Sequence, residues 1–151
     1  MYLGLFTMNT EKEMITNFID ALFEPDSSWD KVAQYVDGKG KFINPILNIA
    51  TIYDLYYRLI DFRKSFPDMT QIVESVGVFE NGNLIAKTFA SATFKGDFAN
   101  FKANDKYWRI PVYWEFELNN GKIMVASELA NHHAINNQLG LALFKAPFES
   151  E

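Results

Sequence analysis

The chain has 151 residues, a net charge of −5, 48% hydrophobic and 22% charged residues, and no cysteine. This composition is typical of one globular domain with a proper core. The acidic balance, without any basic run, argues against a nucleic acid or an anionic membrane as partner. Without cysteine there is no disulfide, thiolate metal site or thiol nucleophile, and a reducing cytoplasmic location is expected.

The first part of the chain is expected to hold a leader and one amphipathic helix. Residues 1–9 are expected to be a flexible leader, without the features of a signal peptide, before a single domain of residues 10–151. Thr10 and Glu13 form a capping box that predicts the start of a helix. Apolar residues at helical spacing then mark its buried face: Met14, Ile15, Phe18, Ile19, Leu22 and Phe23.

Two further helices are expected before Pro67. Ser28 can cap a short helix and Thr51 a longer one, because Ser and Thr accept from the first free backbone N–H groups of a helix. Between them, a turn is predicted at residues 37–40 because of its glycines. A short extended segment is predicted at residues 42–45, since the residue before a proline avoids the helical conformation.

After the third helix the hydrophobic period changes to two, which indicates strands. One strand is predicted near residues 70–79 and a second near 83–94, joined by a turn at residues 81–82. Both strands are mixed in polarity on either side, so their buried face is left unassigned. A polar loop is expected over residues 95–106.

The stretch from Tyr107 to Asn131 carries the strongest local signal. Two long alternating runs flank Asn120-Gly121, a dipeptide typical of a two-residue hairpin turn. Counting outward from this turn puts Glu128 on a face toward solvent or a second subunit. The same register puts the following residues on the opposite, pocket-lining face: Trp108, Ile110, Val112, Trp114, Phe116, Val125, Ser127, Leu129 and Asn131. A short helix near residues 132–141 is expected to follow.

Helices followed by a strand meander predict an α+β fold. We expect a curved antiparallel sheet of about four long strands with the N-terminal helices packed on its concave face, as a cone-shaped barrel. The mouth of such a cone is a natural ligand site. The outward face around Tyr107, Tyr113 and Met124 is amphipathic and predicts a homodimer through sheet packing, with a solvated face as the alternative.

Short motifs occur in a fixed order across residues 10–142. They are Asn44-Pro45, Phe66-Pro67-Asp68, the run Gly82 to Ala86, the run Thr93 to Phe98, Gly121-Lys122-Ile123, and Asn131 seven residues before Gln138-Leu139-Gly140. Together they resemble the SnoaL-like polyketide cyclases of the nuclear transport factor two-like (ketosteroid-isomerase-like) superfamily. The resemblance implies the cone-shaped fold and a cavity within it.

Two departures from the family pattern concern proton transfer. The resemblance implies an acid/base Asp where this chain has Asn131, and a common His where it has Phe94. An amide does not shuttle protons near neutral pH, although it can hydrogen-bond a carbonyl oxygen. The resemblance therefore leaves open whether the chain is an enzyme.

The candidate catalytic residues are His132, as a pocket base, and Asp68, at the rim of the cone. The alternatives are a surface or capping histidine and an aspartate that caps the next turn. Adjacent histidines such as His132 and His133 do not form a natural metal pair, and no third ligand is suggested. No metal and no cofactor are therefore expected.

The candidate ligand-binding residues are Asn131, Ser127, Trp114, Trp108, Phe116, Phe66, Asn44 and Phe94. For Asn131, a helix cap is an equal alternative to a polar anchor for a ligand oxygen. For the aromatic residues, packing in the core is the default alternative.

These patterns predict a SnoaL-like domain whose apolar cavity takes a small hydrophobic or aromatic molecule. If the domain is an enzyme, we expect cofactor-free proton transfer of the isomerase or cyclase type. The alternative is a non-catalytic dimerisation or ligand-binding domain, for which a filled cone would be the sign.

Overall fold

The computed structural model describes residues 2–145, with side chains from Thr10 onward. In chain order its elements are α1 Tyr2–Phe23, α2 Trp29–Ala33, β1 Val36–Ile43, α3 Ile52–Ser65, β2 Thr70–Val78, β3 Leu84–Thr93, β4 Tyr107–Asn119, β5 Lys122–Ala130 and α4 His132–Leu139. Among the helices of this part of the chain, none combines the length and the apolar character that crossing a membrane requires.

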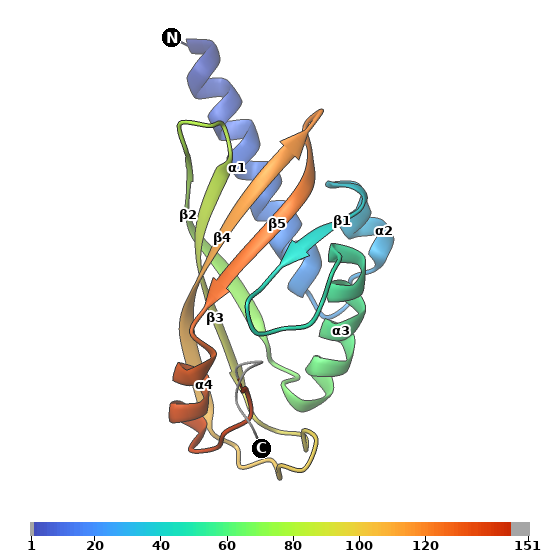
Figure 1. The fold of residues 1–151 in the computed structure, drawn as a ribbon, viewed down its shortest axis with the longest axis vertical. Helices are drawn as coiled ribbons and strands as arrows, with labels where there is room; N and C mark the ends of the chain where they lie inside the picture. Colours follow the sequence, from blue (N-terminus) through green and yellow to red (C-terminus); the bar gives the residue numbers. More distant parts are fainter. Residues whose placement is uncertain (1, 146–151) are drawn as a thin grey trace.

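The strands form one curved sheet in the order β1-β5-β4-β3-β2 (Figure 1). Strands β2 to β5 are an antiparallel meander, and β1 lies parallel to β5. The predicted α+β class, with a curved sheet and packed helices, is confirmed. The sheet has five strands where about four were expected, and the additional strand is β1.

Strand β1 occupies the segment for which a turn was predicted, so that prediction was wrong. Gly38 and Gly40 do have positive φ angles of 60° and 66°, but they produce an irregular register between Val36 and Lys41 instead of a chain reversal. Gly40 also allows α3 to pack closely, because a Cβ atom there would lie 2.6 Å from Cδ1 of Ile52.

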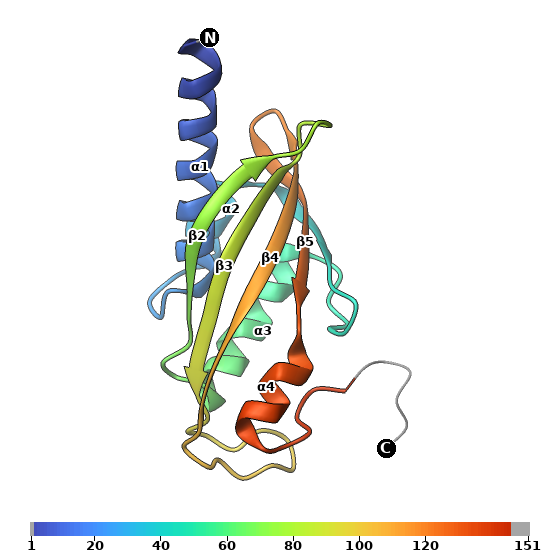
Figure 2. The ribbon, with the colours of Figure 1, turned by 90° about the vertical axis from the view of Figure 1, so that its left-hand side faces the viewer.

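Helix α1 runs beside β2, and its N-terminal end extends beyond the strands, while α3 lies behind the sheet in the view of Figure 2. The predicted start at Thr10 was wrong, since the helix begins at Tyr2. No proline interrupts residues 2–9, so nothing in the sequence prevents the helix from continuing through the capping-box pattern. In its second half, Phe18 packs edge-on against Phe116 with ring centroids 5.8 Å apart.

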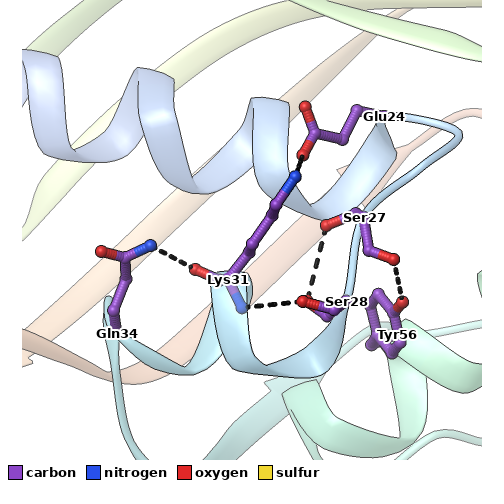
Figure 3. A network of polar contacts seen from close by, with 6 residues as sticks. All are labelled: Glu24, Ser27, Ser28, Lys31, Gln34 and Tyr56. Atoms are coloured by element: carbon purple, nitrogen blue, oxygen red, sulfur yellow. Dashed lines mark hydrogen bonds and ion pairs between the residues drawn. The ribbon is translucent and has the colours of Figure 1, made fainter.

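Polar contacts fix the corner where α1, α2 and α3 meet (Figure 3). The Ser28 hydroxyl accepts from the backbone N–H of Lys31 at 3.2 Å, which confirms the predicted cap of α2. The ammonium group of Lys31 contacts Glu24 at 3.3 Å. The Tyr56 hydroxyl donates to the Ser27 carbonyl at 2.9 Å and so ties α3 to the loop after α1.

The hairpin of β4 and β5 closes as predicted, with Asn119 opposite Lys122. The turn residues Asn120 and Gly121 have φ angles of 52° and 77°, as a type I′ turn requires. The cap of α3 by Thr51 is also confirmed, since its hydroxyl accepts from the backbone N–H of Asp54 at 3.0 Å.

Beyond the turn, a β-bulge changes the register of β5. Leu118 pairs with Ile123 but Glu117 pairs with Val125, which leaves Met124 as an extra residue. Because side chains alternate between the two faces, one extra residue exchanges the faces of everything that follows.

The predicted face of β5 was therefore wrong beyond the bulge. Trp114 pairs with Glu128 and not with Ser127, and Val112 pairs with Ala130 and not with Leu129. We call the face that carries Trp108, Val112 and Trp114 the inner face. The register places Glu128 there, while Ser127 and Leu129 join the outer face.

Candidate functional site

A cavity of about 600 Å³ lies between the inner face and the helices α3 and α4. Its walls include Leu55, Leu59 and Phe62 from α3, Trp108, Ile110 and Val112 from β4, and Ile135 from α4. Small side chains on neighbouring strands, Ala90 and Ala130, also line it. The size of these alanines leaves space that larger residues would fill.

Glu128 is the acidic residue that the bulge brings to this apolar cavity. Its Oε1 accepts a hydrogen bond of 2.7 Å from Nδ2 of Asn44. The orientation of the Asn44 amide is fixed, because its Oδ1 accepts from the backbone N–H groups of Ile46 and Leu47 at 2.8 and 2.9 Å. The NH2 group of Asn44 is therefore held ready for the carboxylate.

Burial raises the pKa of Glu128 to about 7, although the hydrogen bond from Asn44 acts in the opposite direction. As a whole residue Glu128 is only half-buried, so the shift reflects the surroundings of its carboxyl group. Both protonation states are then populated near neutral pH, which is the property of a group that accepts and returns a proton.

His132 and Trp108 also line the cavity, and each has a buried nitrogen atom without a hydrogen-bond partner. His132 is 7% exposed and Trp108 is 3% exposed. Burial lowers the pKa of His132 below its ordinary value, although the contact of the ring with the backbone carbonyl of Ala130 acts in the opposite direction. The neutral imidazole is therefore favoured at pH 7. A neutral imidazole has one nitrogen that donates and one that accepts.

The other predicted catalytic residue, Asp68, does not line this cavity. Its carboxylate accepts from the backbone N–H and the hydroxyl of Thr93, both at 2.7 Å. Burial acts to raise the pKa of Asp68, but the two bonds from Thr93 outweigh it and hold the pKa below its ordinary value. Asp68 thus clamps the start of β2 to the end of β3.

Several predicted ligand-binding residues are packed away from the cavity. The Trp114 Nε1–H donates to Oε1 of Gln71 at 2.6 Å, and its ring is parallel to that of Phe116 with centroids 5.7 Å apart. Phe66 and Phe94 stack on each other at 5.3 Å. These rings belong to the buried core.

The two polar residues predicted on β5 lie elsewhere. Asn131 is exposed and caps α4, with its side chain accepting from the backbone N–H of Ala134 at 3.2 Å. Ser127 pairs with Glu115 and faces outward. Of the predicted site residues, the cavity brings together His132 and Trp108, and Asn44 reaches it through Glu128.

Among the polar residues of the cavity that sequence reasoning missed are Glu128 and Gln71. The bulge at Met124 has no distinctive sequence signal, so counting from the turn placed Glu128 on the wrong face. One signal was present, because Glu128 is the single acidic residue between Ile123 and Ala130. An acid in such an apolar run is a reason to test both registers.

No family model matches the chain, and no curated protein matches it. Solved structures do share its fold. A candidate SnoaL-like polyketide cyclase from Jannaschia sp. CCS1 superposes with a TM-score of 0.72 at 16% identity, over 88% of this chain and 92% of its own. AclR, a candidate hydroxylase from Streptomyces galilaeus, gives 0.70 at 17% identity, over 88% and 86%.

A hypothetical protein from Catenulispora acidiphila DSM 44928 with a ketosteroid-isomerase-like fold, solved in complex with trimethylamine, gives a TM-score of 0.68 at 8% identity, over 87% of this chain and 95% of its own. These similarities confirm the predicted resemblance at the level of the fold. At such low identities a shared fold does not carry a shared activity.

Proposed function

We propose that this chain binds a small, largely apolar carbonyl compound in its cavity and that Glu128 moves a proton on it. The observation that carries the proposal is a carboxyl group whose pKa is about 7, at the wall of a cavity of about 600 Å³. Several solved proteins with the same fold are described as candidate polyketide cyclases, which supports the same class of chemistry by analogy.

The proposed reaction begins with ionised Glu128 as general base. It removes a proton from a carbon next to the carbonyl group, the C–H bond breaks, and its electron pair moves toward the carbonyl oxygen to form an enolate. Where the substrate carries a second double bond conjugated with this enolate, protonated Glu128 returns the proton to the far carbon of the conjugated system. This step moves the double bond, completes an isomerisation and regenerates the carboxylate. No external oxidant or reductant is needed.

A cyclisation follows from the same first step. The enolate carbon attacks a second carbonyl carbon of the same molecule and forms a C–C bond, and the resulting alkoxide takes the proton from Glu128. A carboxylate with a pKa of about 7 is a stronger base than an ordinary glutamate and is still half ionised at pH 7. Asn44 supports this role, because its hydrogen bond favours the ionised form.

Hydrogen–deuterium exchange on 2-tetralone tests the proposal. The protein is incubated with this ketone in D2O, and loss of the C1 proton signal is followed by NMR after subtraction of the buffer rate. Glu128→Gln is expected to reduce the catalysed rate to the buffer rate, because an amide accepts no proton at neutral pH. The control Glu117→Gln, at an exposed position of β4, is expected to keep it.

The outcomes distinguish a catalytic domain from a non-catalytic ligand-binding domain. Full exchange by Glu128→Gln would overturn the role of Glu128. Binding of 2-tetralone by the unmodified protein without any exchange would instead favour a non-catalytic ligand-binding domain.

We also propose that the outer face of the sheet pairs with a second copy of this chain. Exposed apolar side chains on this face include Leu129 at 63%, Ile72 at 67% and Tyr113 at 47% exposure, a pattern expected of an interface. Sedimentation velocity is expected to give a dimer, and Leu129→Lys a monomer with an unchanged circular dichroism spectrum. A monomeric unmodified protein would contradict the proposal.

A further inference from the structure

Two buried nitrogen atoms in the cavity lack a hydrogen-bond partner, Nε1 of Trp108 and Nδ1 of His132. Among the described side chains they are the two buried polar atoms in this state. Buried polar groups in folded proteins are nearly always paired, because leaving one unpaired is costly. An unpaired buried group that faces a cavity therefore indicates a partner that binds there.

The fold treats its other buried tryptophan differently. The Nε1–H of Trp114 is paired with Oε1 of Gln71 at 2.6 Å. Trp108 and Trp114 are both nearly inaccessible, at 3% and 2% exposure, and both lie on the inner face of β4. Trp108 lines the cavity whereas Trp114 does not, so the unpaired indole belongs to the tryptophan at the cavity wall.

The two unpaired atoms border one group of rings, the phenylalanine cluster of Phe62, Phe66, Phe98 and Phe144. The ring of Trp108 lies 6.0 Å from that of Phe66, and the ring of His132 lies 5.0 Å from that of Phe144. Phe62 connects the two sides, at 4.6 Å from Phe66 and 5.9 Å from Phe144. Both residues therefore border the same group of rings.

Trp108 is remote from Glu128. Glu128 pairs with Trp114, and Trp108 lies six positions earlier on the same strand. At about 3.3 Å per residue, roughly 20 Å of strand separate the two backbones. Even after both side chains reach inward, an indole N–H at Trp108 is too far to contact the oxygen of the carbonyl group that Glu128 would act on.

We propose that Trp108 Nε1 and His132 Nδ1 bind a second oxygen of the ligand, at the end away from the reacting carbon. An indole N–H only donates, so the ligand atom is an acceptor, such as the oxygen of a hydroxyl group. The substrate class is thus an elongated ketone with a hydroxyl group at its far end. This inference rests on the proposed function for the position of the ketone.

Calorimetric titration with two matched ketones tests the inference. The probes are 2-tetralone and 6-hydroxy-2-tetralone, which differ by one distal hydroxyl. The unmodified protein is expected to bind the hydroxylated ketone roughly fivefold more tightly, as one net hydrogen bond allows. Trp108→Phe is expected to bind both equally. The control Trp114→Phe removes the same N–H from a tryptophan outside the cavity and is expected to keep the preference.

Three results would overturn the inference. They are an unchanged preference in Trp108→Phe, equal binding of the two probes by the unmodified protein, and no binding of either probe at millimolar concentration. The indole N–H resonance of Trp108 in the unmodified protein gives an answer that needs no variant. It is expected to move downfield with the hydroxylated ketone and to stay with 2-tetralone, and no difference would count against the inference.

Failure of this inference is distinct from failure of the proposed function. The preference for the hydroxyl is an equilibrium measurement and does not require turnover. The proton exchange that depends on Glu128 can be lost in Glu128→Gln while the preference persists, and Trp108→Phe can lose the preference while exchange on 2-tetralone continues.

Discussion

Asp68 and Glu128 both carry a carboxyl group, but their surroundings shift its pKa in opposite directions. At the rim of the sheet, exposed Asp68 accepts two hydrogen bonds of 2.7 Å from Thr93, and its pKa falls below the ordinary value. In the cavity, Glu128 accepts one bond from Asn44, and burial raises its pKa to about 7. The balance between hydrogen-bond donors and burial therefore decides whether the pKa of a carboxyl group falls or rises.

The largest effect expected from this comparison is on proton exchange by Glu128. Because the base form accumulates as pH rises toward 7, the exchange rate on 2-tetralone should rise about tenfold per pH unit in acid and level off above neutrality. Glu128→Gln should lose roughly 100-fold or more at pH 8. A pH–rate profile by NMR checks this, and a profile that levels off near pH 4 would contradict the raised pKa.

The second effect is on stability. The folded state holds the Glu128 proton up to a pH of about 7, whereas the unfolded chain releases it near pH 4.3, so ionisation in the cavity costs stability as pH rises between these values. Glu128→Gln avoids this cost and should be more stable at pH 8 by on the order of 3–4 kcal/mol. Urea unfolding at pH 8 and pH 5 should show a much larger gain in the free energy of unfolding at the higher pH.

The third prediction concerns the hydrogen bond that Asn44 donates to Glu128. Asn44→Ala takes away the hydrogen bond that favours the ionised form, so the midpoint of the exchange profile should move upward by roughly one pH unit. The control Asn137→Ala, at an exposed position of α4, should leave it in place. A midpoint that moves downward would show that Asn44 does not stabilise the carboxylate.

The smallest effect is expected at Asp68. Asp68→Ala should lower the free energy of unfolding at pH 7 by about 1 kcal/mol, since the group is exposed and its bonds are partly replaced by water. Because its folded pKa is lowered, this contribution is present above the unfolded pKa of about 3.9 and is lost as pH falls through the folded value. Thermal unfolding of Thr93→Val, which removes one donor, should show a fraction of the loss.

The parts of the fold that could be predicted from the sequence are those that neighbouring residues determine on their own. Asn120-Gly121 specifies its turn through two positive φ angles, and Ser28 and Thr51 cap the helices that follow them. The first part of strand β1 was missed because its glycines are typical of a turn, and only pairing with the parallel strand β5 makes that part extended. The end of β1 agrees with the extended segment predicted from residue 42.

The candidate site was predicted only in part, because its chemistry depends on long-range pairing. Trp108 was identified, and it lies on β4, the strand without the extra residue. His132 was also identified, and it lies at the start of α4. Glu128 was missed because a bulge is decided by how two strands fit, and Met124 looks like any other strand residue. Phe66 and Phe94 were predicted beside the ligand, and each stacks on the other in the core.

Met124 also links two surfaces that are otherwise separate. The shift that turns Glu128 toward the interior turns Leu129, at 63% exposure, toward the outside. Deleting this one methionine would reverse both positions in a single step, so a chain shortened there would lose Glu128 from the cavity and Leu129 from the outer face together. A change of one residue in strand length between Gly121 and Val125 therefore alters the cavity wall and the outer face of the sheet at the same time.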